Sequence, residues 1–86
     1  MPRDMAGQAR AALENLRRSL DAVGAAFADV VTANRYVTDL SDQDALNRVW
    51  AEYFGESRPT TTTVQVVRLA TDPRCLVEIN AVAVTG

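Results

Sequence analysis

The sequence predicts an α+β fold in which two helices cover one face of a three-stranded sheet, in the order α-β-α-β-β. Two segments repeat apolar residues at helical spacing, and three others are rich in β-branched residues or alternate apolar with polar side chains. The chain has 86 residues, of which 48% are apolar, and this apolar content is enough for one small core. We therefore expect a single domain over residues 1–86.

Residues 4–23 are predicted to form the first helix. Apolar residues recur there in steps of three and four and form one stripe, which comprises Met5, Ala9, Ala12, Leu13, Leu16, Leu20 and Val23. Charged residues take the other faces and are expected to be solvated. Gly24 then stands where a glycine commonly ends a helix.

The next two elements are a strand over residues 30–38 and a helix that ends near Phe54. The segment VVTANRYVT is rich in β-branched residues, which favour strands. Ser41 followed by Asp44 resembles a capping box, so the helix is expected to begin there. Its predicted buried stripe comprises Leu46, Val49, Trp50, Tyr53 and Phe54, with Gly55 as the stop. We interpret the aromatic cluster as core rather than as a ligand cage.

Four consecutive threonines begin the second strand, in the segment SRPTTTTVQVVRL. Threonine favours extended backbone, and Pro59 biases Arg58 away from helix, so a strand is predicted from about Thr61 to Ala70. A turn over residues 71–74 precedes the last strand, over residues 75–84. The first two strands flank a helix and are expected to be parallel.

Composition excludes several classes of function. The net charge is −2, which argues against nucleic acid or an anionic membrane as a partner. All nine basic residues are arginine, so no lysine can hold a pyridoxal cofactor, and no histidine is present. Cys75 is the single cysteine, which fits a reducing cytoplasm. We therefore expect a cytoplasmic protein without cofactor, metal site or membrane span.

The predicted sheet would have one uncovered face. Two helices cover one side only, and Val82 belongs to the other side of the last strand. Three strands are also few for a sheet that carries two helices. Both observations predict self-association.

Four segments in order resemble the C-terminal two-thirds of the Rid family, also called YjgF or L-PSP proteins. They are LENLRRSLDAVGAAFADVV, YVTDLSDQDALNRVWAEYFGE, TTVQVVRL and LVEINAVAV. The resemblance implies a chorismate-mutase-like fold, a homotrimer whose sheets line a central barrel, and clefts between subunits that bind small molecules. It implies hydrolytic deamination of reactive enamines or imines. The family's N-terminal strands have no counterpart here, so we expect a member that lacks them.

The resemblance also implies candidate substrate-binding residues. Thr61 stands at the position of the family's carboxylate-binding arginine, and Thr63 at that of a cysteine or threonine. Glu78 matches an acidic residue of the last strand, and Asn80 replaces the glutamate tied to catalysis. Neutral groups thus replace both charged groups, which predicts little hydrolysis of 2-iminopropanoate or 2-iminobutanoate. The threonines would alternatively serve only as strand formers, and Asn80 as a buried amide.

Two function classes therefore stay open. One is an enamine or imine deaminase, and the other is a trimeric homologue that binds a small ligand or is structural. A ribonuclease has little support without histidine or lysine. Asn47 matches a family asparagine and is interpreted as a structural hydrogen bonder. Arg35 replaces an apolar residue of the family and is interpreted as a surface arginine, the alternative being a replacement contact to a carboxylate.

Overall fold

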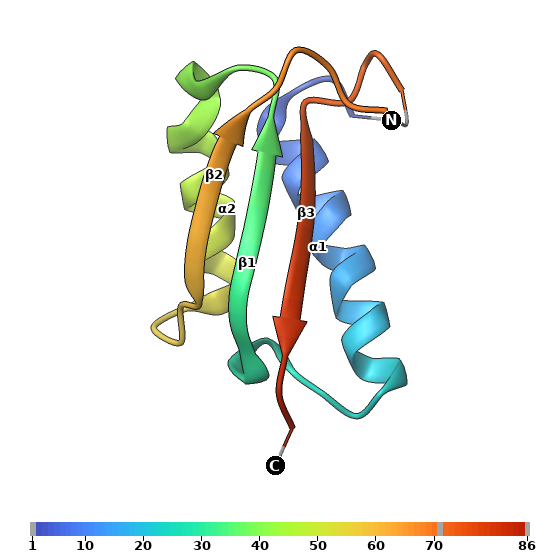
Figure 1. The fold of residues 1–86 in the computed structure, drawn as a ribbon, viewed down its shortest axis with the longest axis vertical. Helices are drawn as coiled ribbons and strands as arrows, with labels where there is room; N and C mark the ends of the chain where they lie inside the picture. Colours follow the sequence, from blue (N-terminus) through green and yellow to red (C-terminus); the bar gives the residue numbers. More distant parts are fainter. Residues whose placement is uncertain (1, 71, 86) are drawn as a thin grey trace.

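The computed structural model describes residues 2–70 and 72–85 and confirms the predicted order of elements (Figure 1). The helices and strands are α1 (Met5–Ala22), β1 (Val30–Val37), α2 (Gln43–Phe54), β2 (Thr60–Gln65) and β3 (Val77–Ala83). Short 3-10 turns over Phe27–Asp29 and Leu40–Asp42 precede β1 and α2.

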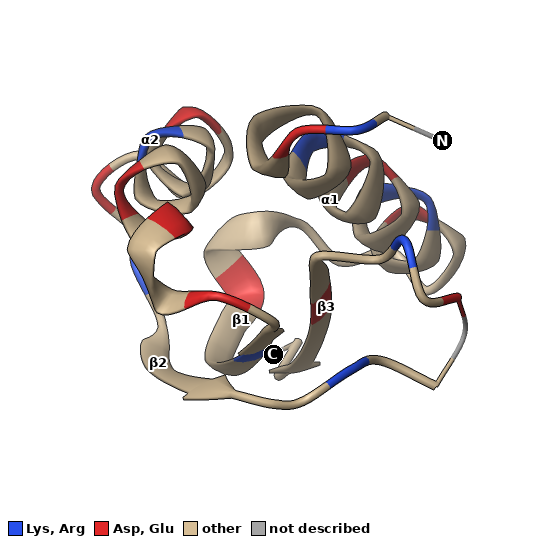
Figure 2. Ribbon diagram, turned by 90° about the horizontal axis from the view of Figure 1, so that it is seen from above, with Lys and Arg blue, Asp and Glu red and all other residues tan. Residues whose placement is uncertain are grey.

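The three strands form one mixed sheet in the order β2-β1-β3. β1 is parallel to β2, as predicted, and antiparallel to β3. Arg35 pairs with Thr63 on one side and with Ile79 on the other. Both helices lie on the same side of this sheet (Figure 2). The predicted α+β fold is therefore confirmed.

Helix α1 begins and ends close to the predicted residues. The Asp4 carboxylate accepts a hydrogen bond from the Gly7 backbone at 3.1 Å and caps the first turn. Gly24 follows the helix with a φ of +73°, a conformation that favours glycine. Val23 was predicted to be part of the buried stripe, which is wrong, because its side chain is 73% exposed. The helix ends one residue earlier, and the chain turns away at that point.

Helix α2 starts differently from the prediction. Asp39, rather than Ser41, provides the local hydrogen bond, because its carboxylate accepts from the Ser41 backbone at 2.9 Å. Residues 40–42 consequently form a 3-10 turn, and α2 begins at Gln43 without a side-chain cap. The predicted capping box of Ser41 and Asp44 is therefore wrong.

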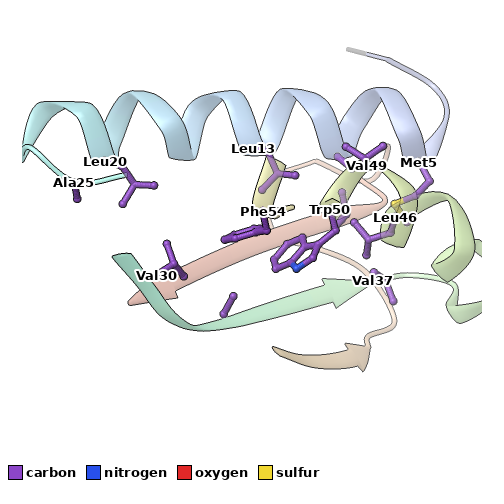
Figure 3. Close-up of a cluster of buried hydrophobic side chains, with 13 residues drawn as sticks. Met5, Leu13, Leu20, Ala25, Val30, Val37, Leu46, Val49, Trp50 and Phe54 are labelled. Atoms are coloured by element: carbon purple, nitrogen blue, oxygen red, sulfur yellow. The ribbon is translucent and has the colours of Figure 1, made fainter. Parts of the chain in front are cut away.

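The core lies between the two helices and the sheet (Figure 3). Buried apolar residues come from α1, α2, β1 and β3, and include Met5, Leu13, Leu20, Val37, Leu46, Val49, Trp50, Phe54 and Val77. Phe27 contacts the rings of Tyr53 and Phe54 edge-on, with centroids 5.6 and 5.0 Å away. The aromatic stripe of α2 is thus mainly core, as predicted.

The last strand is shorter than predicted because Gln8 holds the segment before it. The Gln8 amide donates to the carbonyls of Pro2 and Arg74, both at 2.9 Å, and accepts from the Leu76 backbone at 2.7 Å.

In the turn before β3, Asp72 accepts hydrogen bonds from the Arg74 side chain and backbone, and these hydrogen bonds lower the pKa of Asp72 to about 2. The predicted turn includes Thr71, which lies outside the described residues.

The sheet face opposite the helices is open in the single chain. It carries Val64 and Val82, which are 43% and 56% exposed. The expectation that two helices cover one face only is therefore confirmed. In the described part of the chain, no helix has the length and apolar character needed to span a membrane.

Candidate ligand-binding pocket

A pocket of about 260 Å³ lies where the start of β2 meets α2 and β1. Three parts of the chain line it: β1 contributes Arg35, α2 contributes two side chains, and the segment that enters β2 contributes three. The lining residues are Arg35, Asn47, Trp50, Arg58, Pro59 and Thr61. Among the described residues, two arginines and no acidic residue line the pocket, so it has the chemistry of an anion site.

Arg35 is the central side chain of this pocket, and its interpretation as a surface arginine was wrong. Its side chain shares the helix-covered face of β1 with Ala33 and Val37, and only 4% of the residue is exposed. A long arginine at an inward position must end near α2, since that helix covers β1 there. The guanidinium consequently reaches the Trp50 ring, 5.0 Å from its centroid, where a cation–π contact forms.

Two neutral groups orient the guanidinium. Its Nε donates to the Thr63 hydroxyl at 2.9 Å, and its Nη1 donates to the Asn47 side-chain carbonyl at 2.8 Å. Among residues 2–70 and 72–85, no carboxylate forms an ion pair with Arg35. Burial lowers the pKa of Arg35 from its usual value, but an arginine remains protonated at neutral pH. The pocket therefore contains a positive charge that no described acidic side chain neutralises.

Arg58 adds a second positive charge at the pocket. Its Nε donates to the Gly55 carbonyl at 3.1 Å, which ties the segment before β2 to the end of α2. The residue is exposed, so solvent screens its charge more than that of Arg35. Pro59 and Thr61 complete this wall, and the Thr61 hydroxyl donates to the Pro59 carbonyl at 3.0 Å.

Two of the four predicted site residues meet at this pocket. Thr61 lines it, and Thr63 holds the Arg35 side chain. The alternation of β2 places both threonines on the helix-covered face, opposite Ala33 and Arg35 of β1. The threonine run thus forms a strand, and it also supplies Thr61 to the pocket wall and Thr63 as a hydrogen-bond partner of Arg35.

Glu78 and Asn80 lie on the other face of the sheet. They pair with Tyr36 and Asn34 across the β1–β3 ladder. The Asn34 amide donates to the Asn80 side-chain carbonyl at 3.0 Å, and Asn80 is exposed rather than a buried amide. A single chain therefore does not bring the four predicted residues into one site.

The sequence predicts Arg35 only as an alternative contact to a carboxylate, and it does not predict that Trp50 and Arg58 line a pocket. A usable signal was present for Arg35, because strand alternation places it between the apolar Ala33 and Val37. Asn47 was interpreted as a structural hydrogen bonder, and it does bond to Arg35. Arg58 and Trp50 carry no sequence pattern that separates them from a loop residue and a core residue.

The sequence model described as "Endoribonuclease L-PSP" matches residues 1–85. The chain belongs to this family. It is the YjgF/Rid family that the sequence resembles, so that prediction is confirmed.

Curated relatives support the assignment. A RutC family protein of Pyrococcus horikoshii is 42% identical over 80 residues, which cover 93% of this chain and 62% of the relative. The 2-iminobutanoate/2-iminopropanoate deaminase of Escherichia coli strain K12 is 34% identical over 87 residues, which cover 98% of this chain and 66% of that protein. The chain therefore spans about two-thirds or less of the length of these family members.

Solved structures of the family share the fold. Rv2704 of Mycobacterium tuberculosis, described as a member of the YjgF/YER057c/UK114 family, superposes with a TM-score of 0.94 at 41% identity, over 99% of this chain and 71% of that chain. TdcF of E. coli with bound serine superposes with a TM-score of 0.91 at 36% identity, over 100% of this chain and 68% of that chain.

Proposed function

We propose that this family member deaminates small enamines or imines that carry a carboxylate. One observation carries the proposal: a buried arginine, with no acidic partner among the described residues, lines a small pocket. The relatives of the chain include a deaminase of 2-iminobutanoate and 2-iminopropanoate. Both of those substrates are carboxylates. The serine bound to TdcF also carries a carboxylate.

The reaction would be hydrolysis of a carbon–nitrogen double bond. Water adds to the imine carbon, the carbon–nitrogen bond then breaks, and ammonia and a 2-keto acid leave. A planar guanidinium binds a carboxylate with two parallel hydrogen bonds and thereby fixes the imine carbon in space. The expectation of little hydrolysis rested on two neutral side chains, Thr61 in place of a cation and Asn80 in place of an acidic group. Asn80 remains neutral. Arg35 supplies a cation within the same pocket as Thr61.

A coupled assay tests the proposal. An amino-acid dehydratase generates 2-iminobutanoate, and formation of the keto acid is followed with and without this protein. We expect formation to exceed the spontaneous rate in proportion to the concentration of the chain. In its own chain Asn80 lies on the sheet face opposite the pocket, so in the homotrimer proposed below it would act on the site of a neighbouring chain. Asn80→Glu should then raise the rate by about tenfold to a hundredfold, because a charged hydrogen bond contributes about 1.5–3 kcal/mol. An unchanged rate with folded parent protein would contradict deamination.

A second candidate is a small-ligand-binding homologue without deaminase activity. The neutral Asn80 side chain favours it, as does the absence of a carboxylate among the described residues that line the pocket. Such a protein would bind a keto acid or an amino acid and leave the imine to spontaneous hydrolysis. Binding in calorimetry together with an unaccelerated assay would select this candidate.

We also propose that the functional unit is a homotrimer with ligand sites in clefts between subunits. The open sheet face supports this, since Val64 and Val82 would be covered by neighbouring copies. Glu78 and Asn80 lie on the sheet face opposite the pocket of their own chain. Contact between subunits would bring groups from two chains together at one site.

Light scattering at micromolar concentration measures the particle directly. We expect a mass of about three chains, because the exposed valines of the open sheet face favour association over solvation. Val82→Glu would place a charge on that face and should shift the particle toward smaller species, whereas Val23→Glu changes an exposed residue at the end of α1 as a matched control. A folded monomer of the parent chain would contradict the trimer.

A further inference from the structure

We propose that Arg35 is the side chain that binds the ligand's carboxylate in this pocket, a role carried by β1 rather than by the threonine run of β2. The inference rests on the proposed function only for the class of ligand, a small 2-keto or 2-imino acid. The anion-binding role itself follows from the hydrogen bonds and the position of the guanidinium.

The outer edge of the Arg35 guanidinium is free to bind an anion. A guanidinium has five N–H donors, and two of them are used by Thr63 and Asn47. No described side-chain nitrogen or oxygen is both buried and without a hydrogen-bond partner. Nη2 of Arg35 has no hydrogen-bond partner among the described residues and is therefore not completely buried. Arg35 lines the pocket, so this atom is the candidate donor to a ligand there.

The guanidinium is also held in place before a ligand arrives. The Thr63 hydroxyl, the Asn47 amide and the Trp50 ring contact it from β2 and α2. All three are neutral, so they orient the side chain while leaving its charge to a ligand. A carboxylate in place of one of these groups would have neutralised the charge of Arg35. Prior orientation lowers the entropic cost of binding, which favours a tight contact from one residue.

The pocket selects by size and charge. Its volume of about 260 Å³ is below the range of about 300–1,000 Å³ that is typical of pockets for drug-sized ligands. Arg58 lines the pocket together with Pro59 and Thr61, and it adds to the positive potential. A small monocarboxylate therefore fits the site better than a neutral or extended molecule.

Calorimetric titration of the full chain with 2-oxobutanoate tests this role without requiring turnover. Arg35→Met keeps the length of the side chain and removes the charge, and we expect it to weaken binding by about tenfold to a hundredfold. Arg35→Lys should recover only part of the loss, because an ammonium group lacks the planar fork. The neutral analogue 2-oxobutanamide should bind parent and Arg35→Met proteins equally weakly.

Two further variants separate the effect of Arg35 from a general change in charge and from a loss of folding. Arg48→Gln removes an exposed charge from α2 outside the pocket and should leave the affinity unchanged. Thr63→Val removes one hydrogen-bond acceptor of Arg35 and should weaken carboxylate binding while retaining the charge, and it serves if Arg35→Met fails to fold. Circular dichroism monitors folding of each variant.

The outcomes separate this inference from the proposed function. Binding that depends on Arg35 without any turnover supports the inference and contradicts deamination. Turnover or binding that survives Arg35→Met unchanged overturns the inference and leaves deamination standing. Failure of the folded parent chain to bind 2-oxobutanoate at millimolar concentration also overturns it.

Discussion

Replacing Trp50 with alanine is expected to lower the free energy of unfolding by about 3–5 kcal/mol, the range for truncation of a large buried aromatic residue. Trp50 is 4% exposed and lies between α2 and the sheet, with its ring 4.6 Å from that of Phe54 (Figure 3). Its removal would leave a cavity beside Leu46 and Val49 in a small core. Small domains are stable by only about 5–15 kcal/mol, so this loss would be a large fraction of the total.

Urea denaturation at a fixed protein concentration measures the change. Trp50→Phe retains a ring in contact with Phe54 and should cost clearly less than Trp50→Ala. Arg48→Ala, two residues earlier on the exposed side of the same helix, should change stability by less than about 0.5 kcal/mol. A loss below about 1 kcal/mol for Trp50→Ala would show that Trp50 does not anchor α2.

Trp50 also illustrates which part of the fold could be predicted from the sequence. Apolar residues at helical spacing identify α2 and its buried side, because an amphipathic helix must turn that side to the core. The same argument holds for Leu13 and Leu20 of α1, and strand alternation correctly separates Val77 from Glu78 in β3. These features depend on local periodicity alone, which a single sequence contains.

Element ends and the pocket depend on contacts between distant residues and could not be predicted in the same way. The start of β3 depends on Gln8, which bonds to Leu76 from 68 positions away. The strand propensity of residues 66–70 extended the predicted β2 beyond Gln65, where the observed strand ends. The pocket requires β1, α2 and β2 to meet, and only the three-dimensional arrangement shows that Arg35 and Thr61 share it.

Moving the guanidinium from β1 to β2 is expected to restore carboxylate binding that Arg35→Val has weakened. Thr61 and Arg35 line the same pocket, and their strands are adjacent and parallel. Arg35→Val alone should weaken binding of 2-oxobutanoate by about tenfold to a hundredfold, since one charged hydrogen-bonding group is lost. Arg35→Val combined with Thr61→Arg should recover most of this affinity. The combined variant would carry an arginine at the position where the family resemblance places it.

Thr61→Arg in the parent background is the informative control for this exchange. It would place a second guanidinium beside Arg35, with Arg58 nearby, and no described acidic side chain lines the pocket to offset three positive charges. Like charges at such short range repel, so we expect this single variant to be less stable than the combined one. Thermal unfolding and calorimetric titration of the four proteins form a double-mutant cycle. A favourable coupling free energy of about 1 kcal/mol or more would assign positions 35 and 61 to one carboxylate site. A coupling free energy near zero for both stability and affinity would mean that the two positions do not bind the same anion.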